Sequence, residues 1–441
     1  MKAREILLLL LIIGLGVFTY YAKTGKLNFE WDSGDFVFFG RGEEFLFQES
    51  REIPAPLPRE LQVINSHGGV VVRGTETDKI TIVFTKTVYR RTRDAAQTVA
   101  DQLKMAVNRD ESKLVLSTNR DTFKRKNFET HFEITVPKGF EVKVKNSYLL
   151  VKAVGTGLTD IANPHGQVEA MDIAGPLVVN NSYEDVSILN AGADCRVTSP
   201  HGKVTAIGVQ GELIIDHSYG DVEIENIAKK AVVKGSHSRV TGKNLKAEVE
   251  IESSYEPISV TDSGPTTIRG HHSDIEARGI AGPLSITDNY ARLVVDGVKG
   301  DLRIDGTNME IRAESVAADE IRIATTNQNV EILGFTGKTT VRLNHGDLVL
   351  EPEAVTGPID VQASYAAIRF GWPAGGRFPF EGRTRSANIL WNLAERPSLE
   401  ETNGLSLTKA FQEETGKPSI TLSTSYADIR VVETRRPIKT I

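Results

Sequence analysis

A six-residue motif recurs along most of the chain, and its third position alternates between tyrosine and histidine. Neutral imidazole is a good ligand for Zn²⁺ or Cu²⁺, and aromatic rings can contact glycans, so both chemistries are open to these side chains. The simpler interpretation is a structural ladder, in which each ring at a tight corner stacks on the rings of neighbouring units. We favour the ladder and assign neither a metal nor a cofactor. The ring-bearing positions are Tyr148, His165, Tyr183, His201, Tyr219, His237, Tyr255, His272, Tyr290, His345 and Tyr365, and asparagine takes the same position at Asn308 and Asn327.

Other reactive residue types give little support for catalysis. Cys195 is the single cysteine, so it can form no internal disulfide, and it aligns with Leu177 and Leu213 at an inward-facing apolar position. Aspartates recur at one motif position, which indicates turn chemistry: Asp185, Asp221, Asp274 and Asp347. The sequence offers no nucleophile–base pair or phosphate-binding glycine loop at suitable spacing. We therefore expect no enzymatic activity and name no catalytic residue.

The elements that must position these side chains follow from the apolar pattern. The sixth motif position is Val, Ile or Leu in every unit, and it returns at a nearly constant spacing, as from Val168 to Val186. Each unit holds two alternating apolar segments, such as Leu177/Val179 and Val186/Ile188, with the period of half-buried strands. Units of strand, turn, strand and turn bury their apolar side only by stacking. The sequence therefore predicts an all-β fold, a parallel β-solenoid, over residues 146–369.

The size of one solenoid coil follows less directly from the sequence. A coil made of a single unit would place every ring in one mixed column, whereas a coil made of two units would sort tyrosine and histidine into two columns. The alternation of the two residue types favours units paired into 36-residue coils. With strands about 4.8 Å apart, these coils would form a stack about 30 Å long, against about 60 Å for the smaller coil.

Residues 61–145 are expected to form an N-terminal β unit with one inserted amphipathic helix. Apolar and polar residues alternate in several segments of this region, which predicts strands. Between these segments, apolar residues at helical spacing predict a helix at about 94–107, with Asp94 as its N-cap and Gln97 three residues on. We expect this helix to pack on its own sheet.

Residues 1–22 resemble a membrane anchor. Lys2 and Arg4 precede an uncharged run from Ile6 to Ala22, whose length is at the short limit of a membrane-spanning helix. A cleaved signal sequence is the alternative, although Tyr20 lies where a small residue should precede the cleavage site. By the positive-inside rule, we expect a single-pass membrane protein with a cytoplasmic N-terminus. The bulk of the chain would then be extracytoplasmic, in the periplasm or at the cell surface.

Two further segments lack the repeat. Residues 23–60 form an aromatic-rich linker, whose aromatic part is expected to lie as a strand over the end of a fold or to contact a membrane surface. In residues 370–441, aromatic residues such as Trp372 and Trp391 cluster with proline and glycine, and one last motif returns near the end. We expect this C-terminal region to cap the exposed end of the sheet.

Composition excludes two classes of protein. The chain has 441 residues, with 52 Lys and Arg against 58 Asp and Glu, so its formal net charge of −6 would repel nucleic-acid phosphates. Hydrophobic residues make up 40% of the chain and charged residues 25%, which is unlike a disordered chain. We therefore expect a folded protein with no nucleic-acid partner.

Several of these features resemble the bacterial putative-adhesin family of β-strand repeats, which is a domain of unknown function. They are the Ser-x-His-Gly-x-Val units, the strand–helix–strand insertion before them, and Val136-Pro137-Lys138-Gly139. The resemblance covers roughly residues 61–432. Members typically carry a Ser-Gly-Asp-Val turn, and here tyrosine replaces that glycine in alternate units. The resemblance implies a cell-envelope β-solenoid and brings no catalytic residues.

The sequence thus predicts a noncatalytic, membrane-anchored cell-envelope protein. Its adhesin-like solenoid would present a repetitive surface to an envelope polysaccharide or protein. A structural scaffold that assembles with other membrane proteins is the alternative. A polysaccharide-cleaving enzyme is a weaker alternative, because enzymatic solenoids build their clefts from long inserted loops, and the units here differ little in length.

Overall fold

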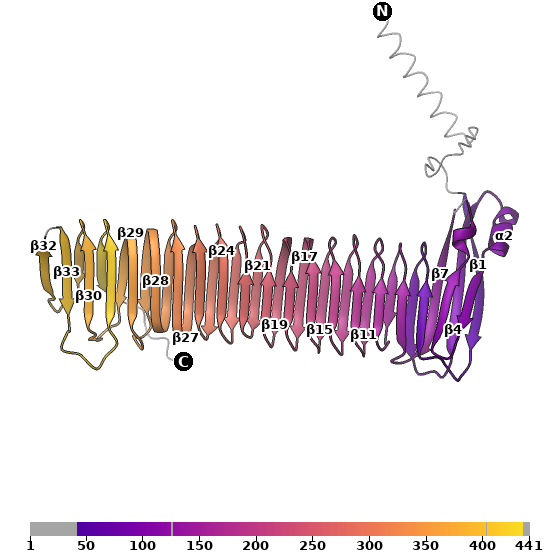
Figure 1. Cartoon of the computed structure of the whole chain (residues 1–441), viewed down its shortest axis with the longest axis horizontal. Helices are drawn as coiled ribbons and strands as arrows, with labels where there is room; N and C mark the ends of the chain where they lie inside the picture. Colours follow the sequence, from indigo (N-terminus) through magenta and orange to yellow (C-terminus); the bar gives the residue numbers. More distant parts are fainter. Residues whose placement is uncertain (1–41, 125–126, 403, 435–441) are drawn as a thin grey trace, which may run out of the picture. The chain divides into compact units, whose positions relative to one another are not determined.

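The computed structural model describes residues 42–124, 127–402 and 404–434 (Figure 1). The expected membrane segment, residues 1–22, and residues 23–41 of the expected linker lie outside this part of the chain. Among the described residues, no helix is long and apolar enough to cross a membrane. The chain divides into two compact units.

The smaller unit, unit 1, comprises residues 42–47, 86–104 and 120–129, without the undescribed 125–126. It contains α2 (Arg93–Gln102) and the short 3-10 helix η1 (Arg120–Thr122). The buried side of α2 packs with strand residues in a small apolar cluster, as expected for a helix that covers its own sheet. The cluster consists of Val88, Ala96, Ala100, Leu103 and Phe128, with Phe45, Phe47, Val99 and Phe123 partly buried against it.

Two details of the expected helix are wrong. Its N-cap is Thr92, whose extended backbone lets the side-chain oxygen accept a hydrogen bond from the Ala95 N–H at 3.3 Å, so Asp94 lies inside the first turn. The helix also ends at Gln102 and does not reach residue 107. The next residues form β5 (Met105–Arg109), which pairs antiparallel with β6 (Lys113–Thr118), so the apolar residues after 104 belong to a strand.

Unit 2 comprises the other described residues and is the predicted parallel β-solenoid, in which tight corners join two faces of stacked strands (Figure 1). Strands of the first face are β2 (Glu60–Ile64), β8 (Glu141–Lys145), β10 (Thr159–Ala162), β12 (Leu177–Asn180), β14 (Cys195–Ser199), β16 (Leu213–His217), β18 (Ala231–Lys234), β20 (Val249–Glu252), β22 (Thr266–Arg269), β24 (Leu284–Asn289) and β26 (Leu302–Thr307). Strands of the second face are β3 (Val70–Thr75), β9 (Val151–Val154), β11 (Val168–Ile173), β13 (Val186–Ala191), β15 (Val204–Val209), β17 (Tyr219–Ile227), β19 (His237–Leu245), β21 (Ile258–Ser263), β23 (Ile275–Ile280) and β25 (Arg292–Lys299). The long strands β27 (Glu310–Thr326), β28 (Val330–Pro352) and β29 (Ile359–Trp372) bend at corners and take part in both faces.

A single repeat unit forms one complete coil of the solenoid, so the expectation of 36-residue coils is wrong. β10 pairs in parallel with β12, with Thr159 opposite Leu177, and β11 pairs with β13 one unit further along the chain in the same way. Each unit therefore closes one coil, with one strand on each face. The inward side chains of two facing strands, such as Val179 and Ile188, already fill the interior, since both are at most 1% exposed. Alternation of tyrosine and histidine along the sequence is thus alternation within one column.

Both ends of the solenoid contain a coil inserted out of sequence order. At one end, β2 and β3 lie between the pair β6 and β7 (Phe128–Pro137) and the pair β8 and β9. At the other end, β34 (Ile420–Ser425) and β35 (Ile429–Glu433) lie between β29 and the pair β30 (Phe380–Arg385) and β31 (Ile389–Asn392). The last motif of the chain therefore occupies an internal position in the stack.

The remaining strands are antiparallel additions. β33 (Leu405–Ala410) pairs antiparallel with β30, and β32 (Ser398–Thr402) pairs antiparallel with β33, just as β5 pairs with β6. Such strands cover parallel edges that would otherwise offer free backbone groups to another chain. β1 (Glu43–Ile53) pairs with β4 (Ile80–Arg90), so this part of the expected linker is a strand.

Candidate functional site

One corner of the solenoid carries an exposed column of stacked aromatic rings. Tyr148 and His165 have ring centroids 4.9 Å apart and planes inclined by 14°, and His165 and Tyr183 are 4.9 Å apart at 6°. The stack continues to Tyr290 with centroid separations of 4.8 to 5.6 Å. We call this set the ring column, and its members are His67, Tyr148, His165, Tyr183, His201, Tyr219, His237, Tyr255, His272, Tyr290, His345, Tyr365 and Tyr426.

The structure brings every predicted ring residue into this column and adds two more. His67 stacks on Tyr148 at 4.4 Å, and Tyr426 stacks on Tyr365 at 5.0 Å. Both additions belong to the coils that are inserted out of sequence order, so following the regular spacing of the motif does not reach them. A signal was nevertheless present, because Asn65-Ser66-His67-Gly68-Gly69-Val70 matches the repeated motif.

The rings of the column turn their edges, and not their faces, toward solvent. Neighbouring planes from Tyr148 to Tyr290 are inclined by only 3 to 19°, so each ring covers the face of the next. Side chains such as Tyr183 and Tyr290 are still 57% and 58% exposed. Among the described residues, no hydroxyl of a column tyrosine has a protein hydrogen-bond partner. The column therefore presents an array of hydroxyl groups and imidazole edges at the spacing of the strands.

From Tyr255 onward, the backbone at this corner restricts which residue types can occupy the column. Tyr255, His272, Tyr290 and Tyr365 all have positive φ, between 54 and 69°. For bulky residues this left-handed region costs about 1 to 3 kcal/mol, whereas each aromatic contact contributes about 0.5 to 1.5 kcal/mol beyond its buried area. A ring stacked on both faces therefore offsets the strain, and asparagine, which tolerates positive φ, is the other residue used.

Beneath the rings, a buried polar ladder satisfies the backbone of the corner. The Asn181 side-chain amide donates to the carbonyl oxygens of Asn163 at 3.0 Å and Gly166 at 2.7 Å. These carbonyls face the interior, where an unpaired polar group would be costly. Other members of this inner ladder, at the first motif position, are Asn146, Ser199, His217, Ser253, Asp288 and Thr325, and all are buried.

The inner ladder contains one serine–histidine hydrogen bond that sequence reasoning missed. His217 Nδ1 lies 2.7 Å from Ser238 Oγ, and His217 Nε2 lies 2.9 Å from the Gly202 carbonyl oxygen. Because a carbonyl only accepts, Nε2 carries the hydrogen and Nδ1 accepts from the serine hydroxyl. Burial lowers the pKa of His217 and keeps the ring neutral. Although a nucleophile and a base could form such a pair, Ser238 is 0% exposed, so a substrate cannot reach it.

The cysteine and the column histidines also lie in unreactive settings. Cys195 is 2% exposed, as predicted for an inward position, and burial raises the pKa of its thiol to about 12. Successive column histidines are separated by a tyrosine, hence by two strand spacings of about 4.8 Å, which is too far to share an ion. Within the described residues there is no group of three or more His, Cys, Asp or Glu side chains that could hold a metal.

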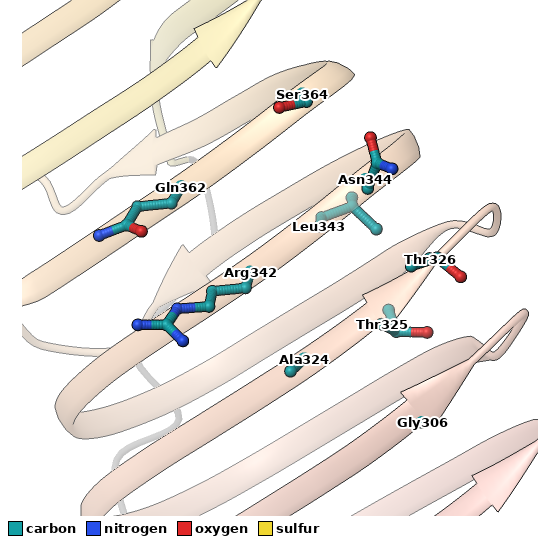
Figure 2. A pocket seen from close by; sticks show the side chains of 9 residues that line it. All are labelled: Gly306, Ala324, Thr325, Thr326, Arg342, Leu343, Asn344, Gln362 and Ser364. Atoms are coloured by element: carbon teal, nitrogen blue, oxygen red, sulfur yellow. The ribbon is translucent and has the colours of Figure 1, made fainter.

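The ring column is interrupted at Asn308 and Asn327, and a hollow opens beside this interruption. The Asn327 side-chain N–H donates to Asn308 Oδ1 at 2.9 Å. The hollow has a volume of about 410 Å³ and lies on the first face, where Gly306 and Ala324 leave space (Figure 2). Its lining residues are Gly306, Ala324, Thr325, Thr326, Arg342, Leu343, Asn344, Gln362 and Ser364.

Comparison with known proteins places this architecture in a family. The model of the family Toastrack DUF4097 matches residues 59–432. The chain belongs to this family. The Toastrack match confirms the family resemblance inferred from the repeated motif, and its limits agree closely with the expected 61–432.

Matches to individual proteins add little to the Toastrack assignment. The solved structure of a protein from Clostridium sporogenes, described as a putative cell adhesion protein, aligns with 88% of this chain and 100% of its own. The identity is 8% and the TM-score is 0.19, a level of likeness that carries no argument about function. No curated protein matches the chain.

Proposed function

We propose that this Toastrack protein is a noncatalytic, membrane-anchored component of the cell envelope, whose solenoid presents a repetitive surface to an envelope polysaccharide. The observation that carries the proposal is the ring column, with its exposed hydroxyl groups and imidazole edges repeated once per coil. A polysaccharide also repeats its hydroxyl groups along one direction. Many weak contacts of the same kind can then form together, and their effects accumulate through multivalency.

The form of the corners supports binding without catalysis. From β9 to β28 the coils have nearly constant length, so this described stretch has no long loops that could wall off a reaction from water, and the hollow beside Asn308 is open to solvent. The one serine–histidine pair of the described inner ladder is buried and inaccessible. An enzyme would need converging polar groups around an accessible reacting atom.

The sequence supports the anchored state. Lys2 and Arg4 precede the uncharged run from Ile6 to Ala22, which suits a single-pass helix with a cytoplasmic N-terminus. Membrane fractions from cells that express the full chain would be washed at alkaline pH, which removes peripheral proteins. The chain should stay in the membrane pellet at its full mass, and release into the wash would contradict the anchor.

Binding is best tested with the full chain in detergent and with fractionated host envelope, assaying polysaccharide and protein fractions separately. The test variant is Y183N/Y219N/Y255N, because asparagine occupies the same corner position at Asn308 and Asn327. The control is Val178→Thr, which alters an exposed first-face side chain away from the column. We expect saturable binding of the wild type to polysaccharide, weakened at least about tenfold in the triple variant and unchanged in the control. Binding to the protein fraction alone, or equal binding by all three proteins, would contradict the proposal.

A further inference from the structure

The interruption of the ring column leaves two ring faces without an aromatic neighbour. Tyr290 stacks on His272 at 4.8 Å, and His345 stacks on Tyr365 at 4.8 Å. On their other faces, no ring lies within the part of the chain that the structure describes, because Asn308 and Asn327 fill the two intervening coils. We call this interruption, together with the adjoining hollow, the notch. It spans three strand spacings, about 14 Å, and at its ends the outer part of an aromatic ring extends beyond the shorter side chain of the neighbouring asparagine.

The notch also holds an exposed arginine. Arg342 is exposed, and no hydrogen-bond or ion-pair partner for it exists among the described residues. Its neighbours in register are Ala324 and Gln362 (Figure 2). The acid on the next strand, Asp360, accepts a hydrogen bond from the Gln362 side chain at 3.1 Å. On the two preceding coils of the same face, Arg303 pairs with Asp305 at 2.5 Å and Arg322 pairs with Glu320 at 3.5 Å. A free guanidinium presents a planar fork of donors that matches a carboxylate.

The rest of the lining suits a ligand rich in hydroxyl groups. Thr326, Asn344 and Ser364 contribute hydroxyl and amide groups to the hollow, and the Gln362 side chain lies along its own strand (Figure 2). A volume of about 410 Å³ lies within the usual range for small-ligand sites. The hollow is open at its sides, so its occupant can be one unit of a longer chain.

We propose that the notch binds an acidic sugar unit of a polysaccharide. The sugar carboxylate would pair with the Arg342 guanidinium, its hydroxyl groups would hydrogen-bond with Asn344 and Gln362, and its ring would lie against the outer part of the His345 or Tyr290 ring. This assignment rests on the proposed polysaccharide-binding function and adds the chemical class of the ligand and its place on the solenoid. The stacked part of the column offers only ring edges, whereas the notch combines the outer part of a ring with a cation and hydrogen-bonding groups.

The test uses the full chain in detergent and titration calorimetry with two probes, polygalacturonate and the same polymer after reduction of its carboxyl groups. Two variants alter the notch. Arg342→Gln removes the charge and places glutamine next to Gln362, which occupies the equivalent position of the following coil. N308Y/N327Y fills the interruption with rings at a backbone conformation that Tyr290 and Tyr365 already adopt. The matched control is Arg322→Gln, which removes an exposed arginine that is paired with Glu320 at 3.5 Å.

We expect the wild type to bind polygalacturonate at least about tenfold more tightly than the reduced polymer, because a hydrogen bond between two charged groups is stronger than one between neutral groups. Arg342→Gln should lose that preference. N308Y/N327Y should lose the same preference even though Arg342 is retained, because its rings fill the notch. The control should match the wild type within about twofold, since its arginine lies outside the notch.

Three outcomes would overturn the assignment, and they separate it from the proposed function. An equal loss of polygalacturonate affinity in Arg322→Gln and Arg342→Gln would show that the polymer is attracted unspecifically to surface charge. Unchanged binding of native envelope polysaccharide by both notch variants would exclude the notch as a binding site and leave the ring column as the binding surface. Failure of the wild type to bind any polysaccharide would contradict both the notch and the proposed function.

Discussion

At the scale of single residues, the inner ladder contains a group that opposes folding. Asp288 is fully buried, and its Oδ2 atom has no hydrogen-bond partner among the described residues. Burial raises the pKa of its carboxyl group, although backbone N–H groups of Asn289, Ser273 and His272 hydrogen-bond to it and act in the opposite direction. A carboxyl whose pKa is raised in the folded state destabilises that state wherever it is ionised.

We therefore predict that Asp288→Asn stabilises the protein at pH 7, by about 1 to 2 kcal/mol. Asparagine already occupies the same ladder position at Asn146, Asn163 and Asn181, so its amide suits this corner. Chemical denaturation of wild type and variant at several pH values gives the difference in free energy of unfolding. The difference should shrink as the pH falls below the raised pKa, because the wild-type carboxyl is then neutral. A difference independent of pH, or a less stable variant, would show that burial of this charge is not the dominant effect.

His217, by contrast, should lower the stability of the fold at acidic pH. Burial is the largest cause that lowers its pKa from the usual 6.5, ahead of the hydrogen bond to the Gly202 carbonyl, which raises it. Since the unfolded chain then binds a proton more readily than the folded one, stability is fully present above pH 6.5 and is lost as the pH falls through the lowered pKa.

We predict that His217→Asn weakens this pH dependence. The variant loses the bond with Ser238, so it should be about 1 kcal/mol less stable at pH 7.5. Between pH 7.5 and pH 5.5, however, its melting temperature should fall less than that of the wild type. Melting curves of both proteins at these two pH values provide the measurement. Parallel losses in the two proteins would assign the acid sensitivity to other groups.

At the scale of elements, a second column of left-handed residues shapes the second face. It lies just before the last inward residue of each second-face strand, where φ is between 53 and 75° in every coil from Asp172 to Gly334. Side chains can bond along this column, as Asn190 Nδ2 does to Asp172 Oδ1 at 3.0 Å. Its members are Asp172, Asn190, Gly208, Asn226, Asn244, Asp262, Gly279, Gly297, Ser315 and Gly334. The regular bend of the strands at this point therefore depends on residues that tolerate positive φ.

Asn226 allows a direct test of that dependence. At φ of 58°, Asn226→Val forces a β-branched side chain into the left-handed region, and we predict a loss of about 1 to 2 kcal/mol in the free energy of unfolding. Asn226→Gly should change stability by only a few tenths of a kcal/mol, because Gly208 occupies the same position one coil earlier. Hydrogen exchange of β17 and β19 would report the local effect. Equal hydrogen-exchange protection in Asn226→Val and Asn226→Gly would mean that backbone strain does not determine which residues this position tolerates.

Sequence reasoning succeeded where the signal is local and repeated. The apolar sixth position sets the register of the stack, and the strands have that register in pairs such as Val186 with Val204. The prediction of coil size failed because the alternation of tyrosine and histidine gives the order of the rings along the sequence. It does not show which rings are in contact in the fold. Sequence reasoning also extended the helix past Gln102, because Ala106 and Val107 fit a helical pattern while their backbone groups bond to β6. In both cases the structure is determined by contacts with other strands, which a local sequence pattern does not show.

At the scale of the whole molecule, the inserted coils could not be predicted from sequence. β2 lies beside both β6 and β8, so Glu60 is in register with Lys113 on one side and with Glu141 on the other. No periodic pattern records such a placement, and for this reason His67 and Tyr426 were left out of the predicted column. In a repeat protein each coil contacts only its neighbours, so an inserted coil controls what lies on both sides of it.

This placement predicts an unusual response to truncation. Deletion of residues 420–441 removes β34 and β35, which separate β29 from β30 and β31. Strands β30 and β31 should then lose their parallel neighbours, and the amides of β30 to β33 should lose protection from hydrogen exchange. Coils up to β25 should keep their protection, because they do not contact the deleted strands. The bare edge of β29 should also promote self-association, visible by light scattering.

A deletion of residues 435–441 alone provides the control, since it leaves β34 and β35 in place. That protein should exchange and scatter like the full chain. Retained protection of residues 380–410 in the longer deletion would mean that β30 pairs directly with β29, and that the last coil of the chain is dispensable for closing the stack. Loss of protection that spreads to β11 or β13 would mean that the solenoid unfolds as one cooperative body. Loss confined to β30–β33 would instead show that the final strands of the chain hold the cap on the solenoid.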